Sequence, residues 1–215
     1  MKAKWQLLSG LPGRRGRHYR AKLARRQFDK ALDECAGMTH IDLGANVGEV
    51  TRQMAAAGVR VIAFEPDPWT AGQLRANVAD LDNVVVEEAA AGIEAGTARL
   101  YRHPEFDETG SGSDWATTCP DKSGAEDASA VDVERVDFVA YLARAAPIGV
   151  LKMDIEGAEF DLLERLLDWP GLPDAVRFIF AETHERCMPG YAERAAALRR
   201  RTRKFKRPRV NLDWP

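Results

Sequence analysis

The chain has 215 residues, of which 45% are hydrophobic and 30% are charged, and its formal net charge is −2. This length suits a single α/β domain with an ample core, and no apolar run is long enough for a membrane-spanning helix. The first ten residues are too interrupted for a signal peptide. Three scattered cysteines (Cys35, Cys119 and Cys187) predict neither a disulfide framework nor a zinc site, and they favour a reducing cytoplasm.

The charge is unevenly distributed along the chain. Residues 1–30 hold ten Lys/Arg and one acid, and residues 199–215 hold eight and one, whereas residues 31–198 hold thirteen and thirty-one. Two basic ends therefore flank an acidic body. We expect the ends to fold back onto that body, because salt screens loosely held tails. The alternative is a patch for an anionic partner such as RNA, a phosphorylated sugar or a membrane surface.

The first expected element is a helix between Arg14 and Ala36, where apolar residues recur at helical spacing and seven Lys/Arg residues form the wet face. Gly37 would end it. We expect residues 1–37 to form a basic helical extension, packed beside or over the glycine turn of a domain that spans residues 38–215.

The segment Thr39 to Thr51 predicts a strand, a tight turn and the start of a helix. Gly44 and Gly48 permit a sharp turn and a close ligand approach, and Asn46 tolerates left-handed geometry. The free N–H groups of the following helix suit an anion or a carboxylate. The spacing differs from the G-x-G-x-x-G dinucleotide fingerprint. An ordinary strand-to-helix turn is the alternative interpretation.

The next unit is an apolar strand over residues 60–65, as expected for a strand covered on both faces, followed by a helix over residues 69–79. Glu65 ends the strand 17 residues after Gly48. From that position its carboxylate can accept hydrogen bonds from both hydroxyls of a ribose. The alternative is an acid in an exposed turn before Pro66.

The middle of the chain is less regular. A strand is expected over residues 83–87, and the small residues that follow, up to Gly92, could form the floor of an adenine pocket or simply a crowded strand end. A strand over residues 97–103 precedes a long segment, residues 104–124, that is rich in Gly, Ser, Thr and Asp. It is either a mobile surface loop or a lid whose candidate substrate contacts are Ser111, Ser113 and Trp115.

The last third predicts two further buried strands. After a strand over residues 131–136 and a helix over residues 137–146, the run I-G-V-L-K-M ends in Asp154, with a helix starting near Gly157. Asp154 and Glu156 therefore lie at the carboxyl edge of the sheet, where open α/β sheets bind ligands. They could instead complement the dipole of the following helix.

His184 follows the strand expected over residues 176–181. A neutral imidazole at a strand end could accept a proton from a hydroxyl nucleophile, although a polar turn residue is an equal alternative. A helix over residues 190–203 and a closing strand or hairpin arm within residues 205–212 complete the chain, and Pro208 favours the sheet edge for the latter.

Four segments together resemble the FkbM-type methyltransferases: D-L-G-A-N-V-G-E-V-T (42–51), F-E-P-D-P (64–68), L-K-M-D-I-E-G-A-E (151–159) and E-T-H-E (182–185). The resemblance implies a class I methyltransferase fold, which is a three-layer, Rossmann-like α/β architecture with a seven-stranded, mostly parallel sheet and helices on both faces. It implies S-adenosylmethionine (SAM) as methyl donor, S-adenosylhomocysteine as product, and an oxygen acceptor on a small or sugar-containing molecule.

The resemblance also implies roles for individual residues. Asp154, Glu156 and His184 would be catalytic, and no metal site is implied. The cofactor-binding residues would be Asp42, Gly44, Ala45, Asn46, Gly48, Glu49, Val50, Thr51, Glu65, Pro66, Asp67, Glu88, Ala89 and Asp154. Two alternatives stay open: an RNA methyltransferase that uses the basic ends, and a SAM-binding module without catalysis. The glycine spacing disfavours a nicotinamide dehydrogenase.

Overall fold

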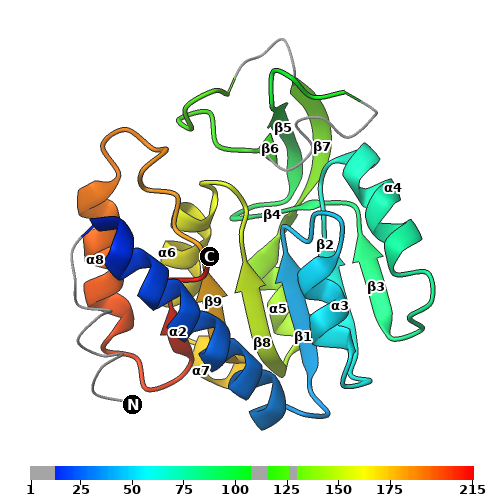
Figure 1. Cartoon of the computed structure of the whole chain (residues 1–215), viewed down its shortest axis with the longest axis vertical. Coiled ribbons are helices and arrows are strands. Elements are labelled where there is room, and N and C mark those ends of the chain that lie inside the picture. The colour runs from blue at the N-terminus through cyan, green and yellow to red at the C-terminus, as the bar shows by residue number, and fades with distance from the viewer. Residues whose placement is uncertain (1–12, 108–115, 126–129) are drawn as a thin grey trace.

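The computed structural model describes residues 13–107, 116–125 and 130–215, and a parallel six-stranded sheet lies at the centre of this described part (Figure 1). In sheet order its strands are β10 (Arg209–Asn211), β9 (Val176–Ala181), β8 (Ile148–Met153), β1 (Thr39–Leu43), β2 (Val61–Phe64) and β3 (Val84–Glu87). The chain proceeds outward from β1 to β3 and returns at β8, beside β1. Strand order therefore reverses between β1 and β8, and ligands bind at such a point in open α/β sheets.

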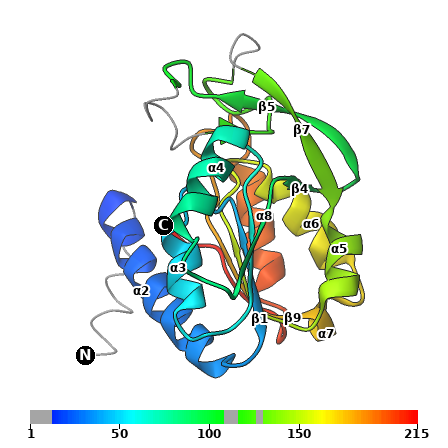
Figure 2. The same ribbon diagram turned by 90° about the vertical axis from the view of Figure 1, so that its right-hand side faces the viewer.

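Helices cover both faces of the sheet (Figure 2). One layer holds α2 (Gly13–Glu34), α3 (Glu49–Ala55) and α4 (Pro68–Asn77), and the other holds α5 (Phe138–Ala145), α6 (Glu159–Asp168), α8 (Ala192–Thr202) and the short α7 (Leu172–Ala175). Successive strand residues face opposite layers, so Ile41 and Leu43 pack with α5 and α6 while Val61 packs with Met54 of α3. The predicted α/β class is confirmed. Across the described ranges, no helix combines the length and the apolar character needed to cross a membrane.

A second sheet lies above the carboxyl edge of the first (Figure 1). Its strands, in order, are β4 (Ala90–Gly92), β7 (Ala130–Asp137), β5 (Gly96–Arg102) and β6 (Ala116–Thr117). The expectation of one seven-stranded sheet therefore differs from the structure, whose described part has six central strands. The reason is that β5 and β7 pair with each other in antiparallel fashion and bury only alternate residues, such as Ala98, Leu100 and Val133, around their own small core.

Each predicted helix and strand is found within a few residues of its expected ends. The closing segment is a strand, β10, and it pairs in parallel with β9 at the sheet edge. The candidate lid residues Ser111, Ser113 and Trp115 lie outside the described residues.

The N-terminal helix packs against β8 and β9, and Phe28 anchors it. It also lies beside α3, the helix that follows the glycine turn, because Asp29 accepts a 2.8 Å hydrogen bond from Gln53. The ring of Phe28 lies 5.2 Å from that of Phe180 and 4.5 Å from that of Trp214, measured between centroids. Trp214 is 4% exposed, so residues from both ends of the chain share one apolar cluster on this face.

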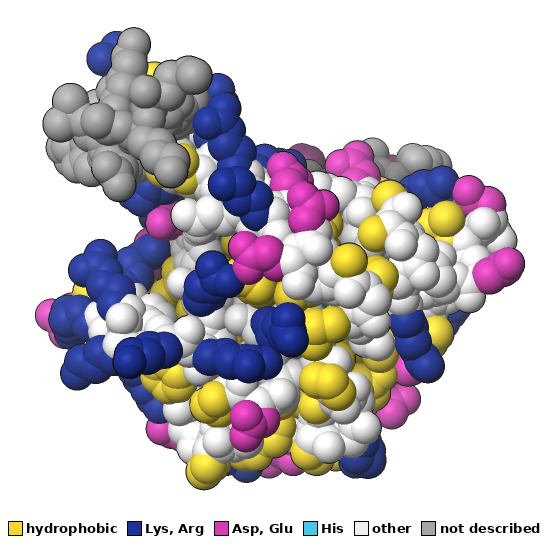
Figure 3. Space-filling model, turned by 90° about the horizontal axis from the view of Figure 1, so that it is seen from below, with side chains coloured by type: hydrophobic (Ala, Val, Ile, Leu, Met, Phe, Trp, Pro, Cys, Tyr) yellow, Lys and Arg dark blue, Asp and Glu magenta, His cyan; other side chains and the backbone are white. Residues whose placement is uncertain are grey.

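The basic ends are partly neutralised by acids, as the fold-back interpretation predicts. Arg20 pairs with Asp213 at 3.1 Å, and Arg209 pairs with Glu34 at 2.6 Å, so each end reaches an acid near the other. Arg201 pairs with Asp168 of the acidic body at 2.6 Å. Lys and Arg side chains nevertheless gather on the left side of the surface seen from below (Figure 3), so much of the positive charge stays at the surface.

Candidate active site

The turn after β1 is set by the close approach of two backbones. Gly44 has a φ of 72°, and a Cβ atom at this position would lie 1.8 Å from the backbone oxygen of Asp154. The Gly44 and Ala45 N–H groups both donate to the carbonyl of Phe64, at 3.0 and 2.9 Å. Asn46 also adopts left-handed geometry, with a φ of 48°. The turn is therefore fixed against the ends of both β2 and β8, as the sequence predicts for a glycine at this position.

Asp42 supports this turn from below. Its carboxylate is fully buried, lies 3.1 Å from Lys152 Nζ and accepts a 2.7 Å hydrogen bond from Thr51 Oγ1. Lys152 also donates to the carbonyl of Gly44 at 2.7 Å. Burial disfavours the charge of Lys152, but the carboxylates of Asp42 and Asp154 outweigh this effect and raise its pKa. Asp42 and Thr51 thus fasten strand, turn and helix together without lining the cavity described next.

A cavity of about 710 Å³, its mouth included, lies between the glycine turn, the end of β2 and the second sheet. This volume falls within the range of small-molecule sites. Six predicted cofactor residues line it: Gly44, Asn46, Glu65, Pro66, Ala89 and Asp154. Eight others do not: Asp42, Ala45, Gly48, Glu49, Val50, Thr51, Asp67 and Glu88. Ala90 and Ala91, which belong to the small-residue run expected as a possible adenine floor, also line the cavity, as does the predicted catalytic Glu156. The lining residues without a prediction are Leu43, Phe64, Thr70, Leu100, Ala116, Thr118 and Ile155.

Glu65 is the buried carboxylate of this cavity. It is 6% exposed, and its two oxygens accept hydrogen bonds from the backbone N–H groups of Asn46, at 2.9 Å, and Asp67, at 3.0 Å. Burial raises the pKa of Glu65 to about 7, although these two bonds oppose the shift. Each carboxylate oxygen has further lone pairs, so Glu65 can still accept hydroxyl donors from a ligand.

The neighbours of Glu65 have structural partners. Asp67 caps α4 by accepting from the N–H groups of Trp69 and Thr70, and it pairs with Arg102 at 2.5 Å. Glu88 pairs at the surface with Arg75 at 2.7 Å.

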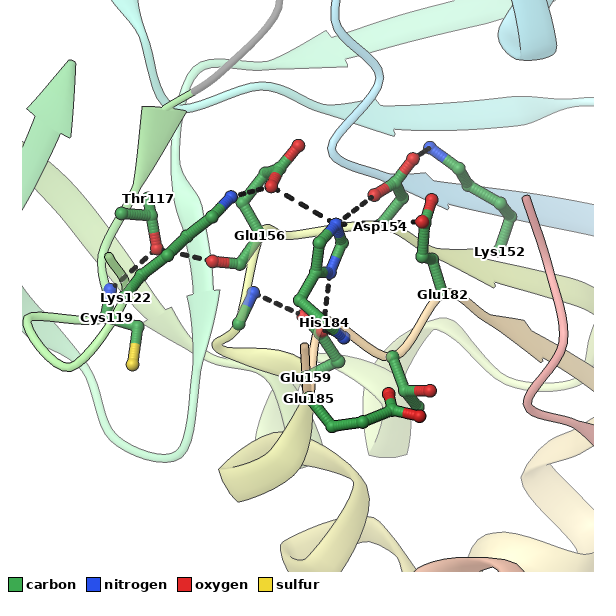
Figure 4. A network of polar contacts seen from close by, with 12 residues as sticks. Thr117, Cys119, Lys122, Lys152, Asp154, Glu156, Glu159, Glu182, His184 and Glu185 are labelled. Carbon is green, nitrogen blue, oxygen red and sulfur yellow. Dashed lines mark hydrogen bonds and ion pairs between the residues drawn. The ribbon is translucent and has the colours of Figure 1, made fainter. Parts of the chain in front are cut away.

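His184 lies at the centre of a cluster of carboxylates beside the cavity (Figure 4). Its Nδ1 atom is 2.7 Å from Glu159 Oε1, and its Nε2 atom is 3.2 Å from Glu156 Oε2 and 3.7 Å from Asp154 Oδ1. Glu182 completes the group at 3.9 Å from Nε2. Burial lowers the pKa of His184, but the Glu159 hydrogen bond and the nearby carboxylates outweigh that effect and raise it. The three predicted catalytic residues, Asp154, Glu156 and His184, are therefore neighbours.

Glu159 and Lys122 were not predicted as site residues. Glu159 is fully buried at the start of α6, where its second oxygen accepts from the Gly157 N–H at 2.8 Å. The ammonium of Lys122 contacts Oε2 of Glu156, and burial lowers the pKa of Lys122 to about 8. Thr117 donates to the Glu156 carbonyl at 2.7 Å. The sequence could have indicated Glu159, because it lies at the predicted start of a helix after a strand end. It gives no comparable signal for Lys122.

The same cluster contains a group able to ligate a cation. Asp154, Glu182 and His184 each offer one ligand atom, and these atoms all lie within 4.8 Å of one another. Asp154 follows β8, whereas Glu182 and His184 follow β9, about 30 residues later in the chain. This separation does not match the short ligand spacings by which metal sites are recognised in a sequence, so the sequence predicted no metal site.

The fold and the site define the class of protein. The doubly wound sheet places a glycine turn, a buried carboxylate and the His184 cluster of carboxylates at one point of strand reversal, where open α/β sheets bind ligands. The methyltransferase FkbM domain model matches residues 42–193. The chain therefore belongs to the FkbM methyltransferase family, and it is a SAM-dependent methyltransferase.

Other comparisons are less informative. A search of curated proteins finds no match. A solved structure from Listeria monocytogenes, provisionally described as a SAM-dependent methyltransferase, shares 14% identity with a TM-score of 0.27, over 56% of this chain and 80% of that one. A TM-score this low carries no structural detail.

The cavity suits the chemistry of SAM. Alanines and Leu100 form an apolar wall fit for a flat ring, and the Glu65 carboxylate is an acceptor fit for a pair of ribose hydroxyls.

Proposed function

We propose that the protein transfers the methyl group of SAM to a hydroxyl group of a small or sugar-containing acceptor. The observation that carries this proposal is the contact between the cavity and the His184 cluster: Asp154 lines the cavity, and its carboxylate lies 3.7 Å from His184 Nε2. A hydroxyl nucleophile loses a proton during methylation, and a positioned imidazole can accept it. A neutral amine acceptor, in contrast, attacks the methyl group with its lone pair and does not need a base to remove a proton before the transfer.

The cofactor residues divide into three regions in this proposal. Ala89, Ala90 and Ala91 form the wall for the adenine ring, and Glu65 accepts from the ribose hydroxyls. The methionine part lies along the turn from Gly44, whose supporting residues Asp42 and Thr51 act indirectly. These assignments follow from which side chains reach the cavity and which are committed to other partners.

SAM supplies an electrophilic methyl group on a sulfonium, and the carbon–sulfur electron pair remains on sulfur as the thioether product forms. His184 Nε2 takes the proton of the acceptor hydroxyl. Glu159 holds the opposite ring nitrogen at 2.7 Å, so it fixes the ring and stabilises the imidazolium. Asp154 and Glu156 add negative charge on the Nε2 side. The remaining requirement is alignment of the acceptor with the methyl group.

The test is release of S-adenosylhomocysteine with a panel of hydroxylated acceptors, carried out with the wild type and His184→Gln. We expect turnover by the wild type and a loss of about 100-fold or more in the variant, with unchanged SAM affinity. A SAM-binding protein that releases no product with any acceptor class would instead be a binding module. Equal turnover in both proteins would remove His184 from the mechanism.

We also propose a reducing cytoplasmic setting, because Cys35, Cys119 and Cys187 are all unpaired.

A further inference from the structure

An open groove runs between the start of α2, the segment after β9 and the C-terminal residues. It encloses about 920 Å³, mouth included. Five arginines line it: Arg14, Arg17, Arg20, Arg186 and Arg199. The acids that line it are Glu182, Glu185 and Asp213, so the charged side chains of the groove sum to +2. We propose that this groove binds an oxyanion, a phosphate or a carboxylate, carried by the methyl acceptor. The inference rests on the proposed function, since it names the class of acceptor.

One wall of the groove is a single helix face. Arg14, Arg17, His18 and Ala21 of α2 all line it, and their spacing of three, four and seven residues places them on one side of the helix. The Phe28 cluster fixes α2 against β8 and β9. The packing of this helix therefore places Arg14 and Arg17 near Glu182 and Thr183, at the carboxyl end of β9.

Two of the five arginines are structural. Arg20 and Arg199 both contact Asp213 Oδ1 at 3.1 Å, and Arg199 also donates to Thr183 Oγ1 at 3.0 Å. Arg14, Arg17 and Arg186 form no ion pair with any acid in the described ranges. These three residues line the groove beside the ion pairs of Asp213, and planar guanidinium groups match the oxygens of phosphate and carboxylate.

Glu182 belongs both to the lining of the groove and to the His184 cluster. This residue lines the groove, and its carboxylate lies 3.9 Å from His184 Nε2, which in turn lies 3.7 Å from Asp154 in the cofactor cavity. In this proposal, a molecule with its hydroxyl at His184 extends past Glu182 into the groove. Its anionic end would be held away from the acidic cluster, which would repel it.

Pyrophosphate and citrate serve as probes for the phosphate and carboxylate forms of the ligand. Each is titrated by calorimetry at constant ionic strength into the protein saturated with S-adenosylhomocysteine. The variants are Arg17→Gln and Arg186→Gln. The matched control is Lys22→Gln, an exposed cation of the same helix that does not line the groove.

We expect saturable binding of at least one probe, weakened about fivefold or more by each arginine variant and unchanged by Lys22→Gln. The probe that binds more tightly identifies the source of the oxyanion. Absence of binding by both probes, or equal weakening in the control, would overturn the proposal. So would tight binding of an RNA oligonucleotide with a steep salt dependence, because that identifies the groove as a nucleic-acid surface. Affinity for SAM, measured separately in each variant, tests the cofactor site independently of this result.

Discussion

Glu159 Oε1 lies 2.7 Å from His184 Nδ1, although Glu159 begins α6 and His184 follows β9, 25 positions later. Glu159 is fully buried, and the same oxygen also accepts the His184 backbone N–H at 3.0 Å. This double contact fixes the ring and directs Nε2 toward Asp154 and Glu156 (Figure 4). The pair has the arrangement of a general base and its orienting carboxylate.

We therefore predict that Glu159→Gln lowers turnover by about 100-fold while leaving SAM affinity within about twofold. The base must be neutral to accept a proton, so wild-type activity should rise as pH increases through the raised pKa of His184. Loss of the Glu159 charge lowers that pKa, and the activity rise should move to lower pH. A pH–rate profile measures both effects. Glu164→Gln, on the exposed side of α6, is the control, and an unshifted profile in Glu159→Gln would contradict the assignment.

The pKa of Glu65 gives a pH dependence to SAM binding. Burial raises this pKa to about 7, so the carboxyl is largely protonated at pH 6 and largely ionised at pH 8. Ribose hydroxyls donate to the ionised form, hence affinity should increase by about tenfold from pH 6 to pH 8, with proton release on binding. Calorimetry in buffers of different ionisation enthalpy measures this release. Glu65→Gln should bind weakly at every pH, and a persisting pH dependence there would assign the titration to another group.

A matched control for substitutions of Gly44 in the turn is Gly37. Both have positive φ values, 72° and 83°, but only at Gly44 would a Cβ atom collide with another backbone, at 1.8 Å from the Asp154 oxygen. At Gly37 nothing lies within 4 Å. Urea denaturation should show that Gly37→Ala costs about 1–3 kcal/mol from conformational strain alone. Gly44→Ala should cost clearly more and abolish SAM binding, and equal costs would show that the close approach is relaxed in solution.

The buried pair of Asp42 and Lys152 should dominate the stability of the sheet centre. Lys152→Met leaves the Asp42 carboxylate buried without its cation, which costs about 3–5 kcal/mol. Thr51→Val removes one hydrogen bond and should cost about 1 kcal/mol. Chemical denaturation measures both values. The double variant Asp42→Leu, Lys152→Met should be less destabilised than the sum of its single variants, and strict additivity would argue against coupling.

The sequence predicted the parts of the site that follow from strand ends. Glu65 and Asp154 come directly after an apolar strand, and His184 lies three residues after one; parallel strands bring such positions to one edge. It did not distinguish side chains that reach the cavity from those that support the turn. Asp42 illustrates this, because its partner Lys152 is 110 positions away and pairs with it only through the β1–β8 register.

The second sheet was the larger omission. Two of its strands, β5 and β7, were predicted individually, whereas β4 and β6 were not. Pairing between β5 and β7 depends on long-range contacts, and no local pattern places Leu100 or Ala116 over the cavity. Lys122 was missed for the same reason. It lies within residues 104–124, where the sequence predicted no helix or strand, and its ion pair with Glu156 forms only once the second sheet lies above β8.

The central claim is that SAM binds at the point of strand reversal and that Glu65 holds its ribose. Calorimetric titration of SAM into the wild type, Glu65→Ala and Glu88→Ala tests it most directly. Glu88 is the matched control, an acid near the same strand end that pairs with Arg75 outside the cavity. We predict one saturable site that is retained in Glu88→Ala and weakened at least tenfold in Glu65→Ala. Equal affinity in all three proteins, or no binding by the wild type, would contradict the account.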